Sequence, residues 1–346
     1  MILRPKLLSR HPGKLLDAVA VAPWALVPAW LRRAIPDAQS VAGKEVEEVA
    51  LAAGAAIGAL DAVVRRQERW AGVWRQRLAL VAAAVTARQA GRVEDSLALR
   101  DAVLLTRPGD FLSVGPAGLL LLAWRRLVDT PAEKLLTERS IGAVLEELGY
   151  APDEEVVSAL VGELGQIGGG AETVGMLTGA FVAAERYGFG PAFGAWLADG
   201  LLAQRLAWPH AIPLLGTEAA FFGMRAGHSR RAATGMAAAG PETEPERAKK
   251  LLAAQARAAL RAIDLFAELG RRAEKLLAVA PKLRAKGADA IVDRLLNEDA
   301  LMASRGDKKM DKKMSDRGLR RLFDRLLVLG AVRELSGRPT FRTYGL

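Results

Sequence analysis

"ERAKKLLAAQARAALRAIDLFAELGRRAEKLLAVAPKLRAKG", residues 246–287, is the stretch that decides the fold class. Alanine, leucine, arginine and glutamate fill most of it, and these residues lose little side-chain freedom in a helix. Pro281 and Gly287 interrupt the pattern at its end. The stretch therefore predicts one long helix from about Glu246 to Val279, followed by a shorter helix from about Ala288 to Leu301.

The rest of the chain has a similar composition. Of its 346 residues, 51% are hydrophobic, 25% are charged and 5% are aromatic. These proportions are typical of a globular protein, and runs of β-branched residues are sparse, so we expect an all-α fold built as a multi-helix bundle or array. The chain has no cysteine, which excludes disulfides, thiolate metal sites and thiol nucleophiles. A reducing cytoplasm suits such a chain, and we expect a cytoplasmic protein.

Composition and the positions of glycine and proline divide the chain into four predicted segments. Apolar residues recur at helical spacing throughout the second segment, between short loops that contain glycine and proline. The third segment is rich in Gly, Ala, Pro and small polar residues, as flexible linkers are. The four segments are an N-terminal arm (1–40), a helical body (41–226), a linker (227–245) and a long helix followed by a C-terminal winged helix-turn-helix (246–346).

Two stretches have alternative interpretations. The apolar run from Leu15 to Leu31 could anchor at a membrane interface, but Asp17, Pro23 and Pro28 interrupt it, so we expect an arm packed on the body and no stable membrane insertion. "GFGPAFG" at 188–194 has the spacing of a dinucleotide loop, but no strand precedes it, and we expect no cofactor there. The dense glycines around it instead predict tight helix crossings.

The positive charge of the chain is concentrated near its end. Residues 304–346 hold 12 Lys and Arg against 5 Asp and Glu, whereas the other residues hold 37 against 34. A positive patch on a nearly neutral body is what a polyanion-binding element requires, because it raises the local concentration of a negatively charged partner. This stretch begins with a doubled Asp-Lys-Lys-Met, which reads as a charged loop.

"SDRGLRRLFDRLLVLG", residues 315–330, predicts an amphipathic helix. Ser315 or Asp316 is suited to the N-cap and Gly330 to the C-cap. At about 100° per residue, the leucines and Phe323 form one stripe, and four arginines fall on the opposite side together with Asp324. "AVREL" and "TFRTY" then predict two short strands joined by the turn "SGRP". A helix, a glycine and one short β-hairpin form the second half of a winged helix-turn-helix.

Two resemblances extend this prediction. "LLVLGAVRELSGRPTFRTYGL" resembles the C-terminal winged-helix pattern of many bacterial proteins, including those appended to Fic-type adenylylating enzymes. The matching positions are Leu326, Leu329, Gly330, Val332, Glu334, Gly337, Arg338, Arg342 and Tyr344. The Fic catalytic signature is absent, so that activity is not implied. Blocks such as "WAGVWRQRLAL", "GPAGLLLLAWRRL" and "SDRGLRRLFDRL" resemble an uncharacterised bacterial family of domains of unknown function, number 1403, over most of the chain.

The predicted function is binding of double-stranded DNA, with a role in regulating transcription or mobile elements. A helix fits the major groove, where arginine can contact guanine edges, and lysines can contact phosphates. One alternative is a non-enzymatic helical scaffold whose basic winged helix docks an acidic protein partner, because winged helices also serve as protein-contact modules. Another is a merely structural tail, because arginines opposite a leucine stripe also describe an ordinary solvated face. The candidate contact residues are Arg317, Arg320, Arg321, Arg325, Arg338, Arg342, Lys308, Lys309, Lys312 and Lys313.

No residues suggest a catalytic or metal site. The three histidines, His11, His210 and His228, are not spaced as ligands of one metal ion. Asp61 and Asp101 lie in apolar helices, and we expect them to form structural ion pairs with arginines such as Arg77 or Arg100 rather than to act as acids or bases. The tryptophans at 70, 74 and 124 have the spacing of core anchors. No residue is therefore a candidate for catalysis, and we expect no cofactor.

Overall fold

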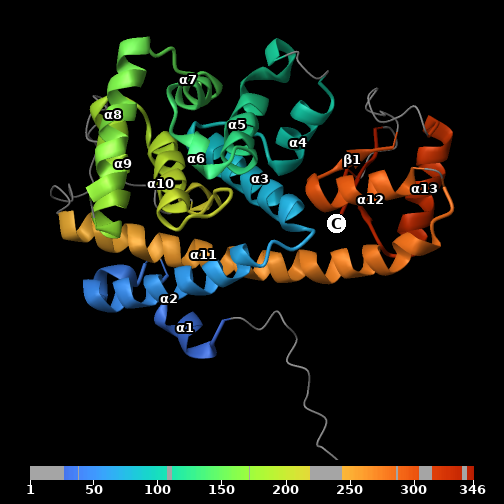
Figure 1. Cartoon of the computed structure of the whole chain (residues 1–346), viewed down its shortest axis with the longest axis horizontal. Coiled ribbons are helices and arrows are strands. Elements are labelled where there is room, and N and C mark those ends of the chain that lie inside the picture. The colour runs from blue at the N-terminus through green and yellow to red at the C-terminus, as the bar shows by residue number, and fades with distance from the viewer. Residues whose placement is uncertain are drawn as a thin grey trace, which may run out of the picture.

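The computed structural model is mostly α-helical, with a small sheet near its end (Figure 1). Thirteen α-helices and three short strands lie within the residues that it describes. These residues are 27–37, 39–106, 111–170, 172–218, 244–285, 287–303, 314–336 and 341–346. None of the helices in these ranges combines the length and the low charge that a membrane span needs. The predicted helical bundle or array is confirmed.

The long helix that opened the sequence is the spine of the molecule. It is α11 (Glu244–Val279), and its 36 residues extend over about 54 Å. Figure 1 shows it running beneath the other helices, with α2 (Val46–Arg65) alongside it. Trp74 fixes α3 to this spine, because its indole N–H donates to the carbonyl oxygen of Ala262 at 2.8 Å and its ring meets Phe266 edge to face. The predicted helix at 246–279 is confirmed.

Most of the remaining body helices lie above α11, around the largely buried α3 (Ala71–Gln89), whereas α1 (Ala29–Ala34) packs on α2 below it (Figure 1). Trp70, Trp74 and Trp124 are all in the core, as predicted. The other helices of the body are α4 (Ser96–Leu104), α5 (Phe111–Asp129), α6 (Ala132–Leu135), α7 (Glu138–Glu147), α8 (Glu154–Gly170), α9 (Thr173–Arg186) and α10 (Pro191–Arg205), with 3-10 turns η1 (Val41–Gly43), η2 (Leu215–Thr217) and η4 (Ala280–Lys282).

Glycines permit two close approaches in this core. A Cβ on Gly194 of α10 would lie 2.6 Å from the ring of Phe181 on α9, so these helices can cross closely only because the side chain is missing. A Cβ on Gly216 would lie 2.2 Å from the ring of Trp124. The buried carboxylate of Asp199 holds that same turn, accepting from the backbone N–H groups of Leu214, Leu215 and Gly216 at 2.9, 3.1 and 3.3 Å. The predicted tight helix crossing is confirmed at Gly194.

The chain ends in what we call the C-terminal module, the described residues from 288 onward. It contains α12 (Ala288–Asn297), β1 (Leu301–Met302), α13 (Asp316–Val328), β2 (Arg333–Glu334) and β3 (Thr343–Gly345). The three strands form an antiparallel sheet in the order β1-β3-β2, with Glu334 and Leu301 both opposite Tyr344. Figure 1 shows the module at the far end of α11.

The module corrects two predictions. The helix expected from 288 to 301 ends at Asn297, because residues 301–302 pair with β3 instead. The expected hairpin of "AVREL" and "TFRTY" forms, but β3 also pairs with β1, so the hairpin belongs to a three-stranded sheet. Residues 304–313 lie outside the described residues, and the winged helix-turn-helix stays a prediction. The predicted linker lies outside them up to residue 243, and the division into domains stays a prediction.

Candidate nucleic-acid interface and an interhelical pocket

Helix α13 carries the predicted recognition face. The side chain of Ser315 caps it by accepting from the backbone N–H of Gly318 at 3.2 Å, and Gly330 follows it in the left-handed conformation, with φ of 64°. Both predicted caps are confirmed. Four residues of its apolar stripe, Leu319, Leu322, Phe323 and Leu326, are buried. Phe323 stacks on Tyr344 of β3 with ring centroids 4.5 Å apart, so the sheet fixes which face of α13 points outward.

The outward face holds four exposed arginines, Arg317, Arg320, Arg321 and Arg325. None of them has an ion-pair or hydrogen-bond partner among the described residues. Many arginines of the body are compensated instead, as in the pairs of Arg186 with Glu163 and of Arg126 with Glu147. Asp324 is exposed on the same face, so α13 presents an excess of positive charge there: four arginines and one acid.

The other predicted contact residues lie elsewhere or outside the described residues. Arg342, just before β3, is half-exposed and its Nη1 lies 3.7 Å from a carboxylate oxygen of Glu334, so its charge is partly compensated. Lys308, Lys309, Lys312, Lys313 and Arg338 fall outside the described residues. Arg333 of β2, which the sequence reasoning did not select, is exposed on the same module.

A buried carboxylate fastens the module to the body. Asp299, between α12 and β1, is fully buried, and Nε of Arg100 donates to it at 2.5 Å. Nε of Arg77 lies 2.5 Å from its other oxygen, and Nη2 of Arg77 donates to the carbonyl oxygens of Asp299 and Leu346 at 3.3 and 3.4 Å. Arginines of α3 and α4 thus hold the start of the edge strand β1 and the end of the central strand β3. The contacts are structural, because all the acceptors belong to the protein.

We expected the acids of the apolar helices to form structural ion pairs with arginines such as Arg77 or Arg100, but Asp61 pairs with another arginine. Asp61 does form a structural ion pair, with Arg65 one turn along α2 at 2.8 Å, and it also accepts from the indole N–H of Trp208. Arg77 and Arg100, which were the expected partners of the acids in these helices, bind Asp299 instead. Sequence reasoning missed Asp299 because it lies about 200 residues from both arginines.

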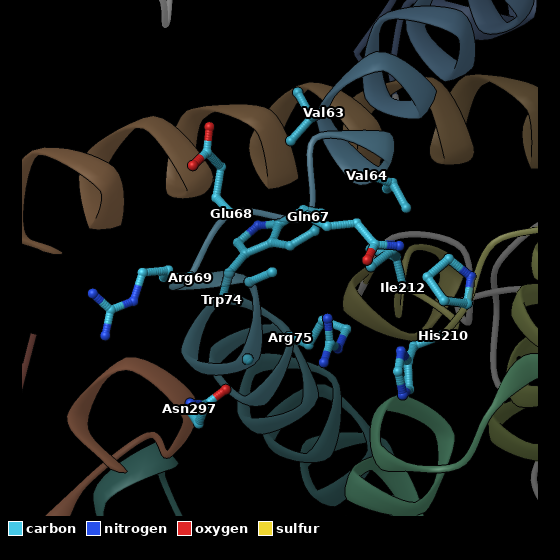
Figure 2. Close-up of a pocket in the computed structure, with 13 residues that line it drawn as sticks. Val63, Val64, Gln67, Glu68, Arg69, Trp74, Arg75, His210, Ile212 and Asn297 are labelled. Atoms are coloured by element: carbon cyan, nitrogen blue, oxygen red, sulfur yellow. The ribbon is translucent and has the colours of Figure 1, made fainter. Parts of the chain in front are cut away.

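A pocket of about 290 Å³ opens between the α2–α3 turn, the first turns of α3, the loop at 209–212 and the end of α12 (Figure 2). The buried side chains of Val63, Val64, Trp74 and Ile212 back the pocket, and the rest of its lining is largely polar. Gln67 stands at the mouth, exposed and with a left-handed φ of 46°. Arg75 and His210 are half-buried between mouth and interior. Figure 2 shows the side chains of Gln67, Arg75 and His210 converging on one side of this pocket.

Arg75 and His210 differ in charge at neutral pH, although burial lowers the pKa of both. Burial lowers the pKa of the Arg75 guanidinium, which the carboxylate of Asp129 opposes, but an arginine stays charged in any accessible range. Burial and the nearby charge of Arg75 lower the pKa of His210 below its ordinary value, again opposed by Asp129. At neutral pH this side of the pocket therefore holds the positive charge of Arg75 beside a neutral imidazole. His210 is a packed loop residue, bridged through its backbone to Pro131.

Metal chemistry has no support in the described residues, since no group of three or more histidine or acidic side chains is placed to hold an ion within them. Comparison with known proteins gives one match. The model of a family described as "Protein of unknown function (DUF1403)" matches residues 19–346. No curated protein matches the chain, and no solved structure does.

Proposed function

The chain belongs to the DUF1403 family of proteins of unknown function, and we propose that it binds double-stranded DNA through α13. The observation that carries the proposal is the exposed set of four arginines on one helix, with no acidic partner among the described residues. Such charge attracts the phosphate backbone, and releasing the counterions of DNA supplies much of the binding free energy.

The dimensions of α13 suit the proposal. Its 13 residues extend over about 20 Å, and the major groove of B-DNA is about 12 Å wide and admits one helix. Arg317, Arg320, Arg321 and Arg325 lie on one side of the helix, where guanidinium groups can contact guanine edges in pairs of hydrogen bonds. The sheet packs on the opposite side through Phe323, as expected of a recognition helix followed by a wing.

A charge-matched comparison tests the proposal on the full chain. In one variant Arg317, Arg320, Arg321 and Arg325 are changed to Gln, which keeps the helix propensity close to that of Arg. In the control, four exposed arginines of α1, α3, α7 and α11 are changed to Gln, namely Arg33, Arg88, Arg139 and Arg271. Both variants lose four positive charges.

Fluorescence anisotropy with a labelled 20-base-pair duplex should separate the two variants. We expect the α13 variant to bind at least about tenfold more weakly than wild type. The slope of log affinity against log salt concentration should be shallower by up to about 3 to 4, because each phosphate contact adds about 0.9 to it. The control variant should bind within about threefold of wild type, since distant charges are screened beyond about 10 Å. Equal losses in both variants, or no binding by wild type at low salt, would overturn the proposal.

A second experiment separates reading of bases from general attraction. We expect Arg320→Ala with Arg321→Ala to reduce the preference for a selected sequence over a random duplex. Lys312→Ala with Lys313→Ala should weaken binding to both duplexes about equally, because lysine contacts to phosphate carry no sequence information. Interchangeable effects of the two pairs would indicate a nonspecific cationic patch.

A second candidate function is docking of an acidic protein partner by the same module. The observation that favours it is the exposure of Val328 at the end of α13 and of Phe341 before β3, at 81% and 60%. Interfaces between proteins place apolar side chains inside a polar rim, whereas DNA interfaces are mainly polar and positively charged. Changing both residues to Ser should leave duplex binding unchanged if DNA is the partner, and should abolish capture of the acidic protein if that candidate is correct.

A further inference from the structure

The pocket at the α2–α3 turn contains a charged group without a partner. The guanidinium of Arg75 makes no hydrogen bond or ion pair within the described residues, and its Nε is buried. A buried donor without an acceptor destabilises a fold, so a ligand that accepts a hydrogen bond from this guanidinium would restore what the fold lacks. We propose that this pocket binds a small organic carboxylate, with Arg75 as the residue that holds the carboxylate group.

The other charges of the pocket are already engaged. At its mouth, Nη2 of Arg69 lies 2.9 Å from Asp293 of α12, and Glu68 lies 3.2 Å from Arg66. The acid within electrostatic reach of Arg75 is Asp129, and its carboxylate accepts from the side-chain amide of Gln76 at 2.6 Å. Arg75 is therefore the charge to which a ligand can bind, and one guanidinium suits a single carboxylate, which it can hold through two parallel hydrogen bonds.

Two neutral polar groups stand beside that charge. His210 stays uncharged near neutral pH, because burial and Arg75 both lower its pKa, so it offers one donor and one acceptor. The amide of Gln67 offers both as well, and Figure 2 shows it extending toward His210. Ligand sites typically combine an apolar cavity with a few such polar groups that fix orientation.

The walls and the volume limit the rest of the ligand. Val63, Val64, Trp74 and Ile212 back the pocket, so an apolar body beyond the carboxylate would contact apolar side chains there. The cavity of about 290 Å³ lies near the lower end of the range known for ligand pockets, about 300 to 1,000 Å³. The class is therefore a compact monocarboxylate with an aromatic or branched aliphatic body.

Isothermal titration of the full chain tests the assignment with benzoate and 4-methylpentanoate as probes. Benzamide serves as the neutral control of the same shape, and inorganic phosphate serves as an anion without an apolar part. We expect both carboxylates to bind with a Kd of roughly millimolar or below, because ligands of this size make few contacts. Benzamide and phosphate should bind at least about tenfold more weakly, since each lacks one of the two features.

Matched variants assign the binding to Arg75. Arg75→Met removes the charge and keeps an apolar stem, and we expect it to lose at least about tenfold in benzoate affinity with an unchanged or higher Tm, because it removes an unpaired charge. Arg69→Gln, at the mouth, should change the affinity by less than about twofold. Should Arg75→Met fail to fold, Arg75→Lys provides the same test, with a smaller loss because the fork geometry is gone. Wild-type protein that ignores both carboxylates, binds benzamide or phosphate equally well, or keeps its affinity in both Arg75 variants overturns the proposal.

Discussion

Asp299 should contribute more to the free energy of unfolding than other residues of the C-terminal module do. Its carboxylate is fully buried and lies 2.5 Å from Nε of both Arg77 and Arg100, whose side chains are 16% and 8% exposed. Replacing it with alanine leaves both guanidinium groups buried without their acid. Breaking a buried ion pair by removing one partner typically costs about 3 to 5 kcal/mol.

A second acid near the same helix provides the matched control. Asp293 of α12 pairs with Arg69 at 2.9 Å, but both side chains are 62% exposed. An exposed pair of this kind contributes about 0 to 1 kcal/mol. The structure therefore predicts that Asp299→Ala destabilises the protein by about 3 kcal/mol more than Asp293→Ala does.

Urea unfolding of the two variants and of wild type measures this difference, with near-ultraviolet circular dichroism as the probe of packing. Amide exchange provides a local readout, because Arg77 also donates to the carbonyl oxygen of Leu346. We expect Asp299→Ala to speed exchange at residues 343–346, whereas Asp293→Ala should leave it unchanged. Free energies of unfolding within about 1 kcal/mol of each other would refute the view that this buried carboxylate fastens the module to the body.

Three further predictions concern single residues. Burial raises the pKa of Asp199 to about 7. The folded protein therefore keeps a proton that the unfolded chain loses near pH 4, so the free energy of unfolding should fall by a few kcal/mol at most as pH rises from about 4 to 7. Urea unfolding should show this fall in wild type but not in Asp199→Asn. Gly216→Ala places a Cβ 2.2 Å from the ring of Trp124, which is fully buried, and should cost about 1 to 3 kcal/mol in the same measurement. Ser315→Ala removes the acceptor for the N–H of Gly318 and should cost about 1 kcal/mol, seen as faster amide exchange in the first turn of α13.

Local sequence features identified most of the helices correctly. The periodicity of α2 and α11, the cap at Ser315 and the glycine at 330 each depend on residues a few positions apart, so they can be read without knowledge of the rest of the chain. Local features are less informative after Pro131, where the chain forms α6, breaks at Leu136 and starts α7 at a new cap, Thr137.

The sequence by itself determined the helical class, the long spine and the amphipathic design of α13, because helix formation is specified by neighbouring residues. Only the tertiary structure decided that β1 joins the hairpin, that Asp299 meets Arg77 and Arg100, and that Arg75 faces a pocket beside His210. These contacts join segments more than 100 residues apart, except for the pairing of β1 with β3, which spans about 40. The spacing of hydrophobic residues along the sequence does not predict such pairings, because they depend on how α3, α11 and α12 pack.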